Sequence, residues 1–428
     1  MLRLDRKQSP EVSFAFWIPT IWFLLLSSRP LSIWFQAGGQ TIEEGSPLDR
    51  AFLTVVLCFG LIMLTKRKFS WSNLIKDNIC LFFLLGFMLI GCIWADTPFI
   101  SFKRWTRELI AITMVAVIAS EPQPLKAIES LFRRSIYILI PFSYVLINYF
   151  SDYGRLYIHH SGDLMWTGVT THKNQLAQLS AFAIIFIIWT FVRRRQGATV
   201  AAPKYQTYLE LFILFLALWI MCGPYHSLTY SATAAISLII GFIMMFYLFW
   251  LKKRNVIIGQ TSLTVIVLVI IIYGTITPMI GKLPIVDVSS VAGREENLTG
   301  RAEVWKELLP VALQHPILGH GHASFWTTSR RDDFDIPTAH NVYLELILTL
   351  GFTGLLLYII FILSNIRAAQ RAMQQNFEWG VFWVCSLMMT IAGNITESSF
   401  VSFESRMMVV ILCLTFATAT SKRKNTEY

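Results

Sequence analysis

Apolar runs close to the length of a membrane-crossing helix recur along the whole chain. In helical form about 20 apolar residues cross the roughly 30 Å hydrocarbon core of a bilayer. With 55% of its 428 residues hydrophobic and only 14% charged, the chain has more apolar sequence than a soluble core requires. We therefore predict an all-α, polytopic integral membrane protein with about 12 transmembrane helices, or about ten if the shortest runs do not cross. The expected spans are 14–27, 50–65, 78–95, 107–120, 133–150, 175–192, 207–223, 229–250, 257–279, 342–364, 379–394 and 405–420.

Basic residues gather in short clusters at alternate ends of these runs. The positive-inside rule places such ends, and with them both termini, in the cytoplasm. The net charge of +10 is spread over these clusters and forms no single patch with interleaved aromatics, so we expect no nucleic-acid partner. The clusters are Arg3/Arg6/Lys7, Lys66/Arg67/Lys68 with Lys76, Lys126/Arg133/Arg134, Arg193/Arg194/Arg195 with Lys204, Lys252/Lys253/Arg254, Arg367/Arg371 and Lys422/Arg423/Lys424.

The remaining loops then face the opposite side of the membrane, and the longest of them is residues 280–341. No internal repeat or low-complexity linker divides the chain, so we predict a single membrane domain, 1–428, with 280–341 as one large external loop, periplasmic in a host that has a periplasm. The six cysteines show no paired spacing, which argues against a disulfide framework or a zinc site.

Within this loop, apolar residues at helical spacing follow Thr299, a plausible helix cap, and predict a helix over 301–313. Arg301 would lie in its first turn, where the helix dipole and unpaired amide groups favour an anion such as phosphate. The alternative is an ordinary ion pair of Arg301 with a nearby glutamate, for which Glu295, Glu296 and Glu303 are the candidates.

The segment His315-Pro-Ile-Leu-Gly-His-Gly-His322 is a turn broken by glycines. Its three histidines invite a metal interpretation, yet no cysteine or carboxylate stands at a familiar ligand spacing. We expect no metal here, and a tight turn that packs the loop onto the membrane domain.

His340 ends the loop and stands directly before an apolar run. The dipole of the helix that begins there disfavours a protonated ring, which lowers the pKa of His340 and leaves a neutral imidazole able to accept a proton. A structural histidine with satisfied hydrogen bonds is the alternative, because a single residue carries little information.

Motifs in this order resemble the O-antigen ligase and polymerase family. In the second half they are Gly300-Arg301 followed by Trp305, the turn 315–322, and His340-Asn-Val-Tyr-Leu344 followed by Gly351-Phe-Thr-Gly354. Earlier motifs resemble the branch of succinoglycan-type exopolysaccharide polymerases. These are Ser28-Arg-Pro-Leu31, Glu44-Gly-Ser-Pro-Leu-Asp-Arg50, Ser101-Phe-Lys-Arg-Trp105 and Trp166-Thr-Gly-Val-Thr-Thr-His-Lys-Asn174.

The resemblance implies a metal-independent, inverting glycosyltransferase without a cofactor in the bacterial inner membrane. Such enzymes move a glycan from an undecaprenyl diphosphate carrier to an acceptor, which is another lipid-linked repeat unit in a polymerase and lipid A core in a ligase. A chain-length regulator is a further partner that the resemblance suggests. It makes His340 the base, with Asn341 in the same motif, and Arg301 the ligand of the diphosphate.

Guanidinium groups neutralise a diphosphate leaving group well, because they bind phosphate bidentately. This chain lacks the arginine that ligases of the family carry in a serine-rich segment, matched here by His226-Ser-Leu-Thr-Tyr-Ser-Ala-Thr233. That departure favours a polymerase and leaves Arg294, Lys173 and Arg406 as candidates for the second phosphate contact. Lys173 has the alternative role of an interfacial anchor, an ambiguity that Arg104 and Arg107 share.

Three further residues are candidates for contact with the sugars: Trp305, Phe325 and Trp326, which could stack on sugar rings or form the core of the loop. Glu345, just inside the tenth span, could support His340 or bind a sugar hydroxyl.

Two other classes of protein share many of these features. One is a lipid-linked glycan flippase or transporter, which would show charges near the middle of its spans and broken helices. The other is a non-catalytic subunit of a polysaccharide export machine, which would use the loop 280–341 for docking and tolerate substitution of His340.

Overall fold

The computed structural model describes residues 11–37, 45–157, 162–197, 203–224, 230–255, 260–280, 295–336, 338–397 and 402–424. Nearly all of the described elements are helices, and the strands among them form one two-stranded antiparallel sheet. The prediction of a helical protein is therefore confirmed, with this short hairpin as an addition.

Seven of the described helices are long and apolar enough to cross a membrane, and α5 with α6, bent by 99° at their junction, gives up to eight. The seven are α4 (Pro47–Lys66), α8 (Pro124–Tyr149), α10 (Lys173–Arg195), α11 (Lys204–Cys222), α12 (Ala232–Lys253), α13 (Gln260–Ile280) and α17 (Val342–Gln375). The remaining predicted spans overlap helices that are shorter or more charged, so the total of ten to twelve stays a prediction. These are η1 (Phe14–Phe16) with α2 (Trp17–Leu26), α5 (Trp71–Asp77) with α6 (Ile79–Ile90), α7 (Pro98–Ala119), α18 (Phe377–Gly393) and α19 (Arg406–Lys424).

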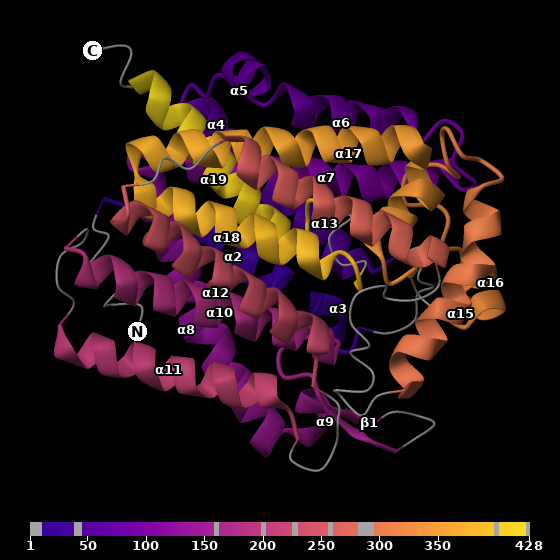
Figure 1. The fold of residues 1–428 in the computed structure, drawn as a ribbon, viewed down its shortest axis with the longest axis horizontal. Helices are drawn as coiled ribbons and strands as arrows, with labels where there is room; N and C mark the ends of the chain where they lie inside the picture. Colours follow the sequence, from indigo (N-terminus) through magenta and orange to yellow (C-terminus); the bar gives the residue numbers. More distant parts are fainter. Residues whose placement is uncertain are drawn as a thin grey trace.

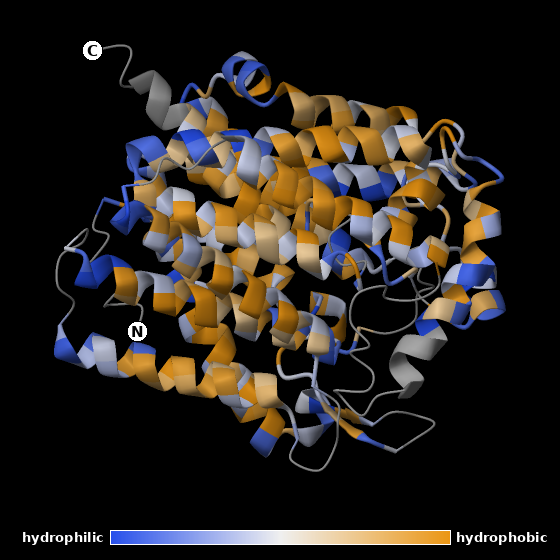
Figure 2. Ribbon diagram, viewed as in Figure 1, coloured by the Kyte–Doolittle hydropathy of each residue, from blue (hydrophilic) through white to orange (hydrophobic). Residues whose placement is uncertain are grey.

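Helix α18 occupies the centre of the bundle, where it packs against α12, α17 and α19. Every residue from Trp379 to Gly393 is buried, as expected for a short helix that is apolar on all sides. Large aromatic side chains fill the space around it, with the rings of Trp189 and Phe382 4.7 Å apart. Hydrophobic residues cover the middle of the helices, and hydrophilic residues gather mainly toward the two ends of the bundle (Figure 2).

One end of the bundle carries the elements of the predicted loop, and we call it the loop end (Figure 1). The N-termini of α10 and α17 and the C-terminus of α18 meet at the loop end, where Asn174 bonds to Glu397 and Asn341 bonds to Ile395, and the C-terminus of α10 lies at the opposite end. The other elements of this end are α3 (Leu31–Trp34), α9 (Ser151–Gly154), β1 (Arg155–Tyr157), β2 (Leu164–Trp166), α15 (Glu295–Ala312) and α16 (Thr328–Phe334), with Arg155 opposite Trp166 in the hairpin.

Helix α17 is broken at Gly351, which has φ 66° and ψ −172°. The turn 315–322 packs into this break: the His320 N–H donates to the Leu348 carbonyl at 2.9 Å, and the Phe352 N–H donates to the Pro316 carbonyl at 2.7 Å. A Cβ at Gly351 would lie 2.3 Å from the Ile317 carbonyl carbon, so glycine is required by space as well as by its positive φ. The prediction that the turn packs onto the membrane domain is confirmed. In the part of the chain that the structure describes, no three His, Cys, Asp or Glu residues form a metal-binding group.

Candidate active site

Asn341 anchors the start of α17 and thereby places His340. Its side-chain oxygen accepts from the Leu344 N–H at 2.9 Å, which caps the helix. Its amide nitrogen donates to the Gly274 carbonyl at 3.0 Å and to the Ile395 carbonyl at 2.9 Å. The side chain is completely buried, so three segments distant in sequence are held together next to His340.

His340 adopts a left-handed backbone conformation, with φ 51°. This region is unfavourable for residues with a side chain and persists only where the surroundings impose it, often at functional sites. The surroundings here include the preceding residue: the Ala339 N–H donates to Glu345 at 2.9 Å and its carbonyl accepts from the Trp305 indole at 2.8 Å. Glu345 also accepts from the Trp326 indole at 2.5 Å. Glu345 therefore holds the backbone that leads into His340.

The aromatic side chains of the loop take part in this core. Trp305, Phe325 and Trp326 are all buried. Of the two roles that the sequence allows, core packing is the one that the structure shows for all three residues.

The His340 ring is half-buried, with 27% of the side chain exposed. Its Nδ1 atom is buried without a hydrogen-bond partner among the described residues, and lies 3.9 Å from Oε2 of Glu397. Desolvation, followed by the charges of Arg301 and His172, lowers the pKa of His340 to about 4. The ring is therefore neutral at physiological pH, as a proton acceptor must be.

Glu397 also lies beside His340, and it belongs to none of the sequence motifs. It follows α18 and is only 7% exposed. Its Oε1 accepts from the Asn174 amide at 2.5 Å and from the Arg301 guanidinium at 3.4 Å. Burial raises the pKa of Glu397, against the opposing charges of Arg301 and Lys173. The one signal in the sequence is that Glu397 is an acidic residue in the short segment between α18 and α19.

Arg301 lies on α15 and is 23% exposed. The sequence offered Glu295, Glu296 and Glu303 as ion-pair partners. The structure pairs Arg301 with Glu397 instead, whereas Glu303 is two positions away and faces another side of the helix. The side chains of Glu295 and Glu296 lie outside the described part of the chain.

The N-terminus of α10 also lies beside Glu397 and Arg301. His172 caps the helix, with its Nδ1 accepting from the Asn174 N–H at 3.2 Å. Desolvation, Lys173 and Arg301 all lower the pKa of His172, which shows that the two cations act on one region. We call His340, Arg301, Lys173, Asn174 and Glu397 the loop-end cluster.

Arg29, from the motif Ser28-Arg-Pro-Leu31, holds the approach to α10. Its buried guanidinium donates to the Thr170 carbonyl at 2.8 Å and to the Gly168 carbonyl at 3.2 Å. Arg29, which is distant in sequence, thus fixes the conformation of the loop that immediately precedes Lys173 and Asn174.

The other candidate cations have different environments. Arg406 donates to the Ser27 carbonyl at 3.2 Å, Arg104 donates to the Ala323 carbonyl, and Arg107 pairs with Glu404 at 2.9 Å. Arg294 lies outside the described residues. Of the candidates for the second phosphate contact, the structure thus brings Lys173 to the loop-end cluster.

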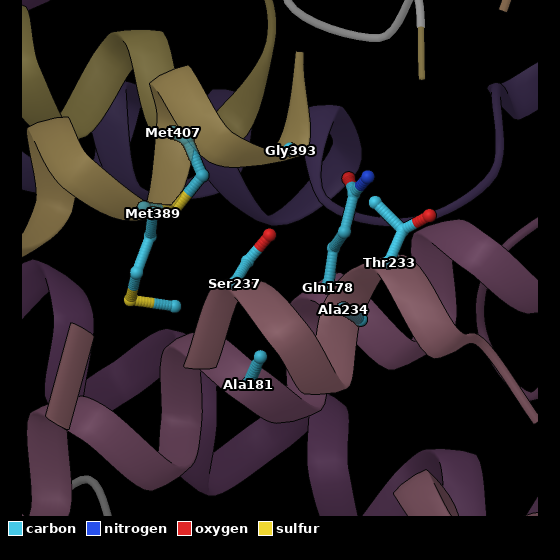
Figure 3. A pocket seen from close by; sticks show the side chains of 8 residues that line it. All are labelled: Gln178, Ala181, Thr233, Ala234, Ser237, Met389, Gly393 and Met407. Atoms are coloured by element: carbon cyan, nitrogen blue, oxygen red, sulfur yellow. The ribbon is translucent and has the colours of Figure 1, made fainter. Parts of the chain in front are cut away.

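A pocket lies between α10, α12, α18 and α19, one helical turn beyond Asn174 (Figure 3). Gln178, Thr233 and Ser237 contribute polar groups to its wall, and Met389 and Met407 contribute flexible apolar ones. Gly393 also lines it, and its carbonyl accepts from the Glu397 N–H at 3.1 Å. One lining residue, Gly393, is thus hydrogen-bonded to a member of the loop-end cluster.

Residues 212–359 match the family model described as O-Antigen ligase. This range is about a third of the chain and includes Arg301, the turn 315–322 and His340 to Leu344. The chain matches none of the curated proteins. The match supports the O-antigen ligase and polymerase family, an O-antigen ligase or polymerase type of function and a multi-pass membrane protein. The branch of exopolysaccharide polymerases stays a prediction.

Proposed function

We propose that this protein is a glycosyltransferase that moves a glycan from an undecaprenyl diphosphate carrier to an acceptor sugar hydroxyl at the loop end. The observation that carries the proposal is the loop-end cluster. A neutral histidine with an unpartnered, buried nitrogen lies beside Arg301 and the N-terminus of α10, although these residues come from three separate segments. A base next to fixed cations is what displacement of a diphosphate requires.

In this proposal Arg301 and Lys173 bind the diphosphate leaving group. Arg301 makes one hydrogen bond to a described residue, at 3.4 Å, which is long for an ion pair. Its planar guanidinium can therefore exchange this contact for two shorter bonds to phosphate oxygens. Lys173 adds a second positive charge, and Arg294 is a further candidate. These residues supply the charge neutralisation, so we propose a metal-independent transfer.

His340 acts on the acceptor. The acceptor oxygen attacks the anomeric carbon and its proton passes to the imidazole, while the bond between that carbon and the phosphate oxygen breaks. The electron pair of that bond leaves with the diphosphate on the carrier. A single displacement inverts the anomeric configuration. Glu397 is buried and holds Asn174 and Arg301, which argues against its forming a covalent intermediate.

The acceptor we favour is a second lipid-linked repeat unit, which makes the protein a polysaccharide polymerase. The support is the segment 226–233, which lacks the arginine expected of a lipid A core ligase. The loop end is then the periplasmic face of the inner membrane, with both termini cytoplasmic, and a chain-length regulator is a partner we expect. Transfer to lipid A core is the alternative within the family.

The break in α17 is the feature that a transporter would share. In transporters such breaks line a cavity for the substrate. Here the turn 315–322 fills the break with backbone hydrogen bonds. The break therefore lends no support to transport.

The test is the size profile of surface glycan in a host that lacks this gene and is complemented with wild type or with His340→Ala at equal membrane levels. We expect wild type to restore long polymer, and His340→Ala to leave single repeat units on the carrier. His315→Ala is the matched control, because His315 is exposed at the same end, and it should restore polymer. Full polymer missing only from lipid A would indicate a ligase, and full restoration by His340→Ala would contradict the catalytic role.

A further inference from the structure

Glu397 is the acidic member of the loop-end cluster, and its two carboxylate oxygens have different surroundings. Oε1 accepts both described hydrogen bonds, from Asn174 at 2.5 Å and from Arg301 at 3.4 Å. Oε2 faces the other way, toward Nδ1 of His340 at 3.9 Å. That distance is too long for a hydrogen bond and short enough to close by a small movement of one side chain.

The two atoms at the ends of this gap, Nδ1 of His340 and Oε2 of Glu397, have no hydrogen bond among the described residues. Nδ1 of His340 is buried with no hydrogen-bond partner among the described residues, and a buried polar atom in that state calls for an explanation. The Glu397 carboxylate is 7% exposed, and its contact with Arg301 is long. A hydrogen bond between Nδ1 and Oε2 would satisfy both groups. The contact of Oε1 with Arg301 instead holds the carboxylate away from His340.

We propose that Glu397 is the positioning residue of His340: it occupies Arg301 while the site is empty, and moves onto Nδ1 when the donor diphosphate takes its place on Arg301. This inference rests on the function proposed above. Phosphate oxygens bind a guanidinium bidentately and carry more charge than a carboxylate, so they displace the weak contact at Oε1. The carboxylate then turns within its own site and accepts a hydrogen bond from Nδ1–H.

The consequence for His340 follows from electrostatics. A carboxylate on Nδ1–H leaves the other ring nitrogen as the proton acceptor and stabilises the imidazolium that forms. In the empty site, desolvation and Arg301 lower the pKa of His340 to about 4, which makes a weak base at neutral pH. Neutralisation of Arg301 by the donor and the arrival of Glu397 both raise it. The base thus becomes effective only in the presence of the donor.

The test uses purified full-length protein with Glu397→Gln, which keeps the shape of the side chain and removes its charge. Binding is measured with a short-chain isoprenyl diphosphate, and kcat for transfer is measured as a function of pH. Glu404→Gln is the matched control, because Glu404, like Glu397, lies between α18 and α19 and pairs with an arginine, Arg107 of α7. We expect the control to leave both measurements unchanged.

The expected result combines changes of opposite sign. Glu397→Gln should bind the diphosphate about three- to tenfold more tightly, because an internal competitor for Arg301 is gone. Its kcat should fall about 10- to 100-fold, within the usual range for general base catalysis. The acid limb of kcat should move about one pH unit lower, because the pKa of His340 in the complex is no longer raised. Glu397→Asp should restore the limb at a reduced rate.

Three outcomes contradict the proposal. Glu397→Gln could weaken binding and kcat together without moving the limb, which is the result of a purely structural role. It could change neither quantity. It could also bind more tightly and keep the wild-type limb, which would show competition without positioning. In each case His340→Ala reports separately on the proposed function: if that variant is inactive the function stands and only the role of Glu397 is wrong, and if it is active the function fails.

Discussion

A pair of an arginine with a buried glutamate lies near each end of α10, and the two pairs differ in how completely the glutamate is hydrogen-bonded. At the C-terminal end, Arg194 pairs with Glu210, which is 3% exposed and also accepts from Gln206 at 2.8 Å and from Tyr137 at 3.0 Å. At the N-terminal end, the carboxylate of Glu397 has two described hydrogen bonds, both on one oxygen.

This difference distinguishes an ion pair that stabilises the fold from a group of residues that can bind a substrate. A buried charge costs free energy that only a complete set of hydrogen bonds offsets. Glu210 has such a set, and a second arginine, Arg193, pairs with Glu129 at 3.0 Å at the same end. Among the described residues, the loop-end cluster leaves a buried ring nitrogen, one carboxylate oxygen and most of a guanidinium without a hydrogen bond. Groups left incomplete in this way can bind a substrate.

Among substitutions of residues in these ion pairs, Arg301→Ala should give the largest loss of activity. Removal of the guanidinium takes away charge stabilisation of the leaving group, which we expect to lower kcat/KM for the lipid-linked donor by about 10²- to 10³-fold. The melting temperature should fall less than for Arg194→Ala, because the contact of Arg301 with Glu397 is long and Glu397 keeps its hydrogen bond from Asn174. Transfer assays and thermal unfolding in detergent check both statements. A large loss of stability at unchanged activity would place Arg301 with the structural pairs.

Arg194→Ala should have the reverse pattern. It leaves the buried Glu210 without its cation, which costs about 3 kcal/mol of stability for a buried pair. The activity of the protein that remains folded should stay near the wild-type value, because Arg194 and the loop-end cluster lie at opposite ends of α10. Thermal unfolding with a parallel transfer assay measures both. Lost activity at full stability would break the comparison between the two ends.

The pH dependence of kcat/KM reports the base of the empty site. Because the pKa of His340 is lowered to about 4, the ring accepts protons throughout the range above that value. We expect kcat/KM to stay level from pH 8 to about 5, to be halved at about pH 4, and to approach a tenfold fall per unit below that pH. The sign agrees with linkage, since a histidine with a depressed pKa destabilises the folded state as pH falls from 6.5 toward 4. A limb near 6.5 would show an exposed, uncoupled His340.

Lys252→Ala should have the smallest effect. Lys252 pairs with Glu378 at 3.1 Å, and its side chain is 46% exposed. Exposed pairs contribute about 0 to 1 kcal/mol, so both stability and transfer should stay near wild type. Thermal unfolding of this variant beside Arg194→Ala tests whether burial, and not the pairing itself, makes an ion pair structural in this protein.

Much of the helical fold could be predicted from the sequence, because the hydrophobicity of a segment depends only on the residues within it. Each of the predicted apolar intervals overlaps a helix. The bounds were harder to predict: the break at Gly351 lies inside one uninterrupted apolar run, 342–364, and the turn that fills it comes from a separate segment.

The candidate site likewise contains residues that the sequence singles out and residues that only the structure identifies. His340 and Arg301 stand out as polar residues beside apolar helices, and their motif resembles a known family. Glu397 carries no motif, and Arg29 lies in one without an evident role. Their importance arises from contacts between residues more than 90 positions apart, such as Arg301 with Glu397 and Arg29 with Thr170. Spacing along the chain contains no information about such contacts.

The sequence by itself determined that this protein is helical and that it is apolar enough to span a membrane several times, and it placed candidate site residues in and beside one long polar segment. Only the tertiary structure decided which charges are satisfied. Arginine and glutamate look alike at both ends of α10, and packing completes the hydrogen bonds of Glu210 and leaves those of Glu397 and His340 unfinished. The physical reason is that the cost of burying a charge depends on the number and geometry of its partners, and folding alone brings those partners together.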